Sequence, residues 1–258
     1  MKFFHYLFFI FLFNSLFASE VISLQTRDNV KQNFLLEMPK NEAKAIVLLF
    51  PGGNGKILLH KDKENWNTKN FLIRSRDYFL QEDFIVVSID VPSDRRSKDG
   101  MYYNFRSSNE HLTDIKRVIN YLKNNYQKPI FLIGTSRGTE SVAFLASKLN
   151  DKINGIILSS SITKKNSKGK SLEELELSEI TTPTLIVFNE KDKCRVTPPE
   201  GSKQLFDLLS NEIKKEYKIF NGGKNKDTNP CKAMTYHGFL GIEKDVVDYM
   251  SQWIKKLI

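Results

Sequence analysis

The chain has 258 residues, of which 40% are hydrophobic and 27% are charged. This composition is that of an ordinary globular protein and excludes a disordered chain, and the length suits one large domain with a single core. The net charge of +9 raises the question of nucleic-acid binding. The basic residues are scattered, and no arginine-rich helix, stacking platform or zinc module accompanies them. We therefore expect a basic, solvated surface and no nucleic-acid partner.

The first residues have the pattern of a secretory signal peptide. Lys2 precedes a dense apolar run over residues 6–13, and the small residues Ala18 and Ser19 follow. A charged start, a short apolar core and a small-residue end are typical of such a leader. The run is shorter than the roughly 20 apolar residues of a membrane span, although an uncleaved anchor is the alternative. We predict cleavage after Ala18, a mature domain over residues 19–258, a periplasmic or secreted location, and no stable membrane insertion after cleavage.

The rest of the chain alternates between strand and helix patterns. Two strand patterns, over residues 21–25 and 34–36, flank a turn and are expected to pair antiparallel at one sheet edge. Apolar runs that suit strands of a parallel sheet follow at 45–50, 84–89, 130–133, 156–158, 184–188 and 217–220. Apolar residues at helical spacing occur over 71–80, 112–122, 142–149, 205–209 and 242–254. The order predicts an α/β fold, with a mostly parallel sheet of about eight strands and helices on both faces.

A Gly-x-Ser-x-Gly motif, formed by Gly134, Ser136 and Gly138, lies between a strand pattern and a helix pattern. In that setting the motif is the nucleophile elbow of α/β-hydrolases. The serine occupies a strained turn with no room for a side chain at either glycine. It also lies at a helix N-terminus, where the helix dipole favours negative charge. We predict Ser136 as a nucleophile; an incidental serine in a glycine-rich turn is the alternative.

A serine hydroxyl is a weak nucleophile at neutral pH and needs a base. In this fold an acid and then a histidine follow the serine along the chain, and His237 is the one histidine after Ser136. We therefore predict His237 as the base. His60 and His111 are flanked by polar residues, so we expect both at the surface.

The acid should follow the strand pattern over residues 184–188, where Glu190 and Asp192 compete. Its carboxylate accepts a hydrogen bond from the imidazole, which holds the tautomer and stabilises the imidazolium. We favour Asp192 because it is deeper in the loop.

Two backbone N–H groups should point at the substrate oxygen, where negative charge develops. One belongs to Arg137, the residue after the nucleophile. The other should come from the glycine-rich loop after residues 45–50, from Gly52 or Gly53, with a slight preference for Gly53.

The chain has two cysteines, Cys194 and Cys231. An even count in an exported chain predicts a disulfide, and this one would tie the loop of Asp192 to the loop of His237. Neither cysteine has a second one nearby at ligand spacing, so we expect no metal site. No organic cofactor is indicated.

With these residues identified, the chain resembles the α/β-hydrolase superfamily over essentially all of residues 19–258. The segments similar to dienelactone-hydrolase-like and small esterase or peptidase branches are residues 134–139, 192–198 and 237–239. Residues 194–199 and 237–243 are also similar to a group of exported bacterial hydrolases. The dienelactone branch is expected to use a cysteine nucleophile, where this chain has Ser136. The resemblance implies an exported serine hydrolase that cleaves carboxylic esters through an acyl-enzyme. A peptidase or amidase with the same triad, and a catalytically silent fold that binds a cell-envelope partner, are the alternatives.

Many relatives insert a large helical cap after the strand that ends here near Ser160. This chain offers residues 161–180, a polar, lysine-rich stretch with one helix-like piece over 172–177. We expect a small cap and an open site for a small-molecule ester or amide. Arg137 would either attract a carboxylate-bearing substrate or pair with an internal acid such as Glu140; we favour the pair.

Overall fold

The computed structural model describes residues 19–258. The predicted signal peptide, residues 1–18, lies outside the described residues. Between residues 19 and 258, no helix combines the length and the apolar composition that a membrane crossing requires.

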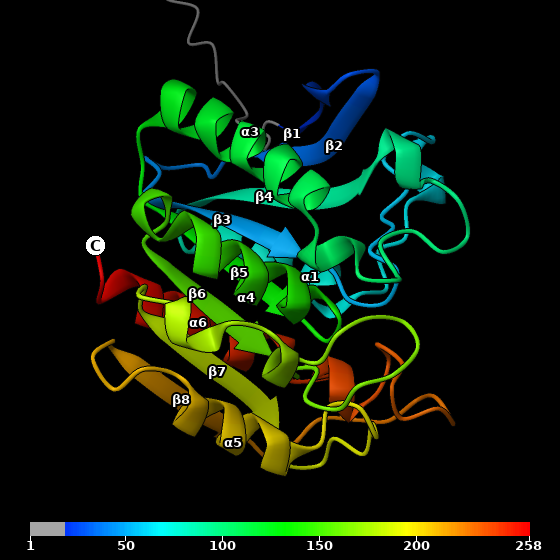
Figure 1. Ribbon diagram of the computed structural model, residues 1–258, viewed down its shortest axis with the longest axis vertical. Helices are drawn as coiled ribbons and strands as arrows, with labels where there is room; N and C mark the ends of the chain where they lie inside the picture. Colours follow the sequence, from blue (N-terminus) through cyan, green and yellow to red (C-terminus); the bar gives the residue numbers. More distant parts are fainter. Residues whose placement is uncertain (1–18) are drawn as a thin grey trace, which may run out of the picture.

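Over residues 19–258 the chain folds around one sheet of eight strands (Figure 1). Their order across the sheet is β1-β2-β4-β3-β5-β6-β7-β8. The strands are β1 (Ser19–Arg27), β2 (Val30–Glu37), β3 (Ala45–Phe50), β4 (Phe84–Pro92), β5 (Ile130–Thr135), β6 (Gly155–Ser159), β7 (Thr184–Asn189) and β8 (Lys215–Phe220). β2 pairs antiparallel with both β1 and β4, and every other pair is parallel. The predicted mostly parallel sheet, with a leading antiparallel pair at one edge, is confirmed.

The apolar runs form strands because both faces of the sheet are covered. All residues of the inner strands β3 and β5 are buried, whereas β8 at the edge is largely half-buried. One face packs against α3 (Asn109–Tyr126), α4 (Gly138–Leu149) and α5 (Pro199–Leu208). The other packs against α1 (Phe71–Arg74), α2 (Arg76–Gln81) and α6 (Glu243–Lys255). Successive strand side chains alternate between these two apolar layers.

The segment between β6 and β7 is small. Its only regular elements among the described residues are two single-turn 3₁₀ helices, Leu172–Glu174 and Leu177–Glu179. The predicted small cap is confirmed. Because parallel strands end at one edge of the sheet, the loops after β3, β5, β7 and β8 meet there.

The prediction that His111 lies at the surface is wrong. The imidazole is fully buried, with its ring centroid 6.2 Å from that of Phe50 and 5.6 Å from that of Phe105. Burial lowers the pKa of His111 to about 3. His111 precedes Ile115 and Val118 by four and seven positions, which places it on the apolar stripe of α3 despite its polar sequence neighbours. His60 is exposed, as expected.

Candidate active site

Ser136 occupies a sharp turn between β5 and α4, with φ at +52°. Its N–H donates to the carbonyl of Ser159 at 2.9 Å, which fixes the turn to β6. A Cβ at Gly134 would lie 2.7 Å from the carbonyl oxygen of Gly138, and a Cβ at Gly138 would collide with the carbonyl of Phe50. The strained serine therefore depends on both glycines of the motif.

His237 and Asp192 form a buried hydrogen bond of 2.8 Å between Nδ1 and Oδ2. An ionised carboxylate only accepts hydrogen bonds, so Nδ1 carries the imidazole proton and Nε2 is left with its lone pair. Glu190, the rival acid, is exposed, and its carboxylate accepts a hydrogen bond from Asn221 instead. The structure thus brings Asp192, and not Glu190, to the imidazole.

Two further donors hold the Asp192 carboxylate in place. The N–H of Cys194 donates to Oδ1 at 2.8 Å, and the Thr197 hydroxyl donates to Oδ2 at 2.9 Å. The same hydroxyl lies 3.1 Å from Nδ1 of His237. Together these donors fix the rotamer of Asp192. Sequence reasoning assigned Thr197 no role of its own, because a threonine in a proline-rich turn carries no motif.

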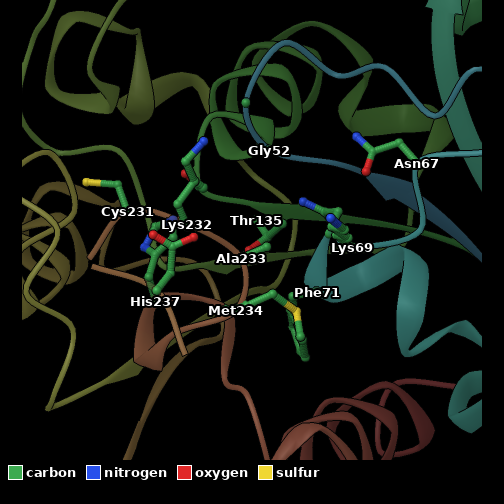
Figure 2. Close-up of a pocket in the computed structure, with 15 residues that line it drawn as sticks. Gly52, Asn67, Lys69, Phe71, Thr135, Cys231, Lys232, Ala233, Met234 and His237 are labelled. Carbon is green, nitrogen blue, oxygen red and sulfur yellow. The ribbon is translucent and has the colours of Figure 1, made fainter. Parts of the chain in front are cut away.

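Ser136 and His237 line the same cavity, which has a volume of about 380 Å³ (Figure 2). Gly52, Gly53 and Phe71 are also in its wall. Among the described residues, no hydrogen bond joins the Ser136 hydroxyl to the imidazole; in enzymes this bond is often long until substrate binds.

The loop after β3 lies against the serine elbow. A Cβ at Gly52 would lie 3.0 Å from that of Ser136, and Gly53 has φ at +59°. Within residues 19–258, the backbone N–H groups of Gly52, Gly53 and Arg137 donate to no protein acceptor. All three predicted donors are thus available beside Ser136, and the structure does not select between the two glycines.

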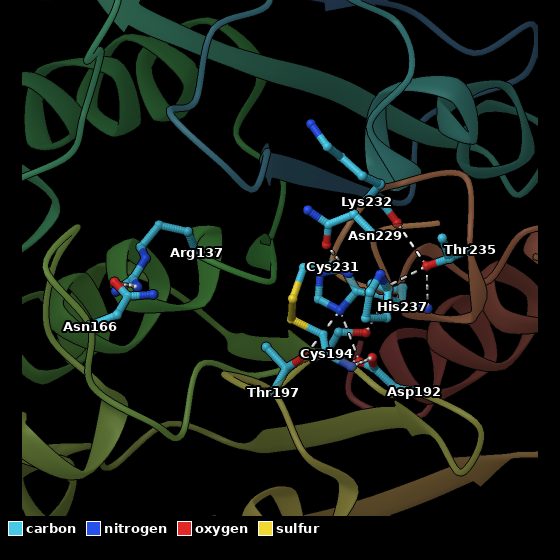
Figure 3. Close-up of a disulfide and its surroundings, with 12 residues drawn as sticks. Arg137, Asn166, Asp192, Cys194, Thr197, Asn229, Cys231, Lys232, Thr235 and His237 are labelled. Atoms are coloured by element: carbon cyan, nitrogen blue, oxygen red, sulfur yellow. Dashed lines mark hydrogen bonds and ion pairs between the residues drawn. A yellow bond between two sulfur atoms is a disulfide. The ribbon is translucent and has the colours of Figure 1, made fainter. Parts of the chain in front are cut away.

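A disulfide joins Cys194 to Cys231, with the Cα atoms 4.6 Å apart (Figure 3). The predicted pairing is confirmed, and it connects the loop of Asp192 to the loop of His237. On the histidine side, the Thr235 hydroxyl accepts a hydrogen bond from the N–H of His237. It donates in turn to the carbonyls of Pro230 and Lys232, so the loop is braced from within.

Comparison with protein-family models and with curated proteins finds no match. Solved structures do match. Est1E from Butyrivibrio proteoclasticus is 16% identical with a TM-score of 0.64, over 92% of this chain and 98% of that one. A dienelactone hydrolase from Anabaena variabilis is 13% identical with a TM-score of 0.66, over 94% and 99%. An alpha-beta serine hydrolase homologue from Coxiella burnetii is 17% identical with a TM-score of 0.59, over 93% and 97%. The chain has the α/β-hydrolase fold.

Within this α/β-hydrolase fold, a buried arginine supports the glycine loop. Arg106 Nη2 donates to the carbonyls of Pro51 at 2.9 Å and Gly53 at 3.3 Å, and Nη1 donates to the Ser141 hydroxyl at 2.9 Å. Burial lowers the pKa of Arg106 to about 10, so the guanidinium stays charged at neutral pH. Sequence reasoning missed this residue because it lies in a short 3₁₀ turn without a motif.

Arg137 is committed to internal contacts, as favoured from the sequence. Its Nη1 lies 3.2 Å from Oε2 of Glu140, and both side chains are buried. It also donates to the carbonyl of Lys170 and to the side chain of Asn166, each at 2.7 Å. This arginine therefore attaches the small cap to the start of α4.

Proposed function

We propose that the mature chain, residues 19–258, is an exported serine hydrolase that cleaves carboxylic esters. Ser136 is the nucleophile, His237 the base, and Asp192 the acid that orients the base. The observation that carries this proposal is the buried 2.8 Å bond from His237 to Asp192, in a wall of the cavity that also contains the strained serine. Two fold neighbours, a cold-adapted esterase from an Arctic intertidal metagenomic library and the Pyrococcus furiosus esterase Pf2001, support an ester substrate.

In the first step, the Ser136 hydroxyl gives its proton to Nε2 of His237 while Oγ attacks the ester carbonyl carbon. The carbonyl electrons move onto the oxygen, which accepts hydrogen bonds from the N–H of Arg137 and of Gly53. Asp192 stays ionised and stabilises the imidazolium. The intermediate then collapses, Nε2 protonates the leaving alcohol, and the acyl group remains on Oγ. Water, deprotonated by His237, releases the acid by the same steps.

Export is supported by two features. The leader pattern precedes residue 19, and the disulfide is of the kind that persists in oxidising compartments. Cleavage after Ala18 would place the mature N-terminus at the start of β1.

The test is labelling of the oxidised mature protein with a fluorophosphonate probe, with the adduct mapped by mass spectrometry. Hydrolysis of a short 4-nitrophenyl ester and of the matching 4-nitroanilide is measured in the same preparation. We expect one adduct, on Ser136, and loss of ester turnover in Ser136→Ala. Ser178→Ala, which changes an exposed serine of the cap, should retain full activity.

Faster turnover of the anilide than of the ester would make the protein an amidase. A folded, disulfide-intact protein with neither adduct nor turnover would overturn the proposal and favour a binding protein of the cell envelope.

A further inference from the structure

A second cavity, of about 360 Å³, adjoins the first at Ser136. Its wall contains basic side chains from four segments and no aspartate or glutamate among the described residues. The basic residues are Arg137, Lys168, Arg195 and Lys232. A cavity wall with only positive charges, next to a candidate nucleophile, attracts anionic substrates.

Three of these cations have no acidic partner. Arg137 is neutralised by Glu140, but Lys168, Arg195 and Lys232 are exposed and form no ion pair with any residue in the range 19–258. The ammonium of Lys168 lies 5.1 Å from the ring centroid of Tyr102, another residue of the cavity wall. Their positive charge is therefore available to a ligand.

The disulfide holds two of the cations near each other. Arg195 directly follows Cys194, and Lys232 directly follows Cys231. Because the linked Cα atoms are 4.6 Å apart, the Cα atoms of Arg195 and Lys232 are separated by about 12 Å at most. Like charges would otherwise move apart, so the covalent link pre-organises a cationic site before any ligand arrives.

The position of His237 decides which part of an ester faces these cations. This assignment of the acyl and alcohol portions to the two cavities rests on the proposed function. His237 lines the first cavity and not the second. Since its Nε2 must protonate the leaving oxygen, the alcohol portion lies in the first cavity. Phe71 and Met234 contribute apolar side chains to that cavity, and its charged residues are Lys69, Asp227 and Lys232, the last of which it shares with the second cavity. The acyl chain then extends into the second cavity.

We propose that the preferred substrates carry a carboxylate at the far end of the acyl chain, and that Lys168, Arg195 and Lys232 bind it. Each cation should raise the affinity for the carboxylate about threefold, which is the contribution typical of an exposed ion pair. Together they favour the anionic acyl chain by about thirtyfold over a neutral chain of the same length.

The test compares two esters with equal acyl chain length, 4-nitrophenyl hexanoate and mono-4-nitrophenyl adipate. The variant Lys168→Gln/Arg195→Gln/Lys232→Gln removes the three charges. The control removes the same number and types of charge outside both cavities, as Lys116→Gln/Arg117→Gln/Lys214→Gln.

We expect the ratio of kcat/KM for the adipate to that for the hexanoate to fall about thirtyfold in the first variant and to be unchanged in the control. The adipate preference of the native protein should also weaken with added salt, because the Debye length falls from about 30 Å at 0.01 M to about 3 Å at 1 M. Equal ratios in both variants, with hydrolysis still dependent on Ser136, would overturn this inference and leave the proposed function standing.

A second measurement covers the case in which neither ester is hydrolysed. Monomethyl adipate is titrated by calorimetry into Ser136→Ala, combined with either triple variant. An affinity for monomethyl adipate that is about thirtyfold lower in the cavity variant than in the control supports the anion site. This result does not depend on whether the proposed function is correct. No binding, or equal binding, overturns it.

Discussion

Removal of the disulfide should affect both the stability of the fold and the geometry of the site. In the chain-entropy model the stabilisation depends on the size of the closed loop, and Cys194 and Cys231 are 37 positions apart. A loop of this size corresponds to about 3.8 kcal/mol at 25 °C. One kcal/mol shifts Tm by about 2–4 °C in a domain of this size. We therefore expect Tm to fall by about 8–15 °C.

The variant suited to this test is Cys194→Ala/Cys231→Ser. Alanine is chosen at position 194 because that side chain is 1% exposed, and a serine hydroxyl there would risk lacking a partner. Serine suits the half-buried position 231. Calorimetry gives Tm, circular dichroism reports the fold, and ester hydrolysis is followed over the same temperatures.

We expect a folded variant at 25 °C whose kcat/KM is lowered by about ten- to hundredfold, because the acid loop and the histidine loop are no longer tied. Its activity should disappear several degrees below its Tm, and the native protein reduced with dithiothreitol should behave likewise. Full activity in completely reduced, folded protein, or a Tm shift below about 2 °C, would refute the reasoning.

Three other substitutions test individual contacts. Asp192→Asn should lower kcat by about 10⁴-fold, because the imidazole tautomer is no longer held. The control Glu190→Gln should keep kcat within twofold of the native value. Equal effects of the two substitutions in steady-state assays would contradict the assignment of the acid. Thr197→Val keeps the side-chain shape but removes the hydroxyl that donates to Asp192. It should lower kcat about tenfold, which corresponds to the loss of one hydrogen bond to a charged group. An unchanged kcat would show that this donor is dispensable. His111 has its pKa lowered from 6.5 to about 3 by burial, so the unfolded chain takes up the proton first as pH falls. Stability from this group is complete above about pH 6.5 and is lost between that value and pH 3. Between pH 7 and pH 5 the native protein should lose about 2 kcal/mol of unfolding free energy that His111→Phe does not lose. Identical pH dependence in urea unfolding would contradict this reading.

Much of the fold could be predicted because it depends on local patterns. The unbroken apolar runs of β3 and β5 are those of strands covered on both faces, and the alternation with helices fixes the crossovers. Ser136 and His237 could be located because the elbow has a steric signature and the chain order leaves one candidate base. The choice of Asp192 over Glu190 rested on loop depth alone, and the structure places Asp192 at the imidazole.

The unpredicted features are contacts between distant segments. Arg106 acts on the carbonyls of Pro51 and Gly53, more than 50 positions away, and no local pattern records such a bond. The Thr197 hydroxyl lies 3.1 Å from Nδ1 of His237, which is 40 positions away. His111 was assigned to the surface from its neighbours along the chain, although its ring contacts Phe50 of β3 and Phe105, which lies before α3 begins.

The candidate site is assembled from widely separated positions, from Gly52 after β3 to His237 before α6. During synthesis the serine elbow leaves the ribosome about 100 residues ahead of the histidine loop, an interval of about 5–20 s at ordinary rates of translation. For that time the nascent chain has the proposed nucleophile without the proposed base, and the second cysteine has not yet emerged. On the proposed function, a product that stops short of residue 231 would contain the elbow yet lack activity, because the disulfide and the histidine loop are both missing.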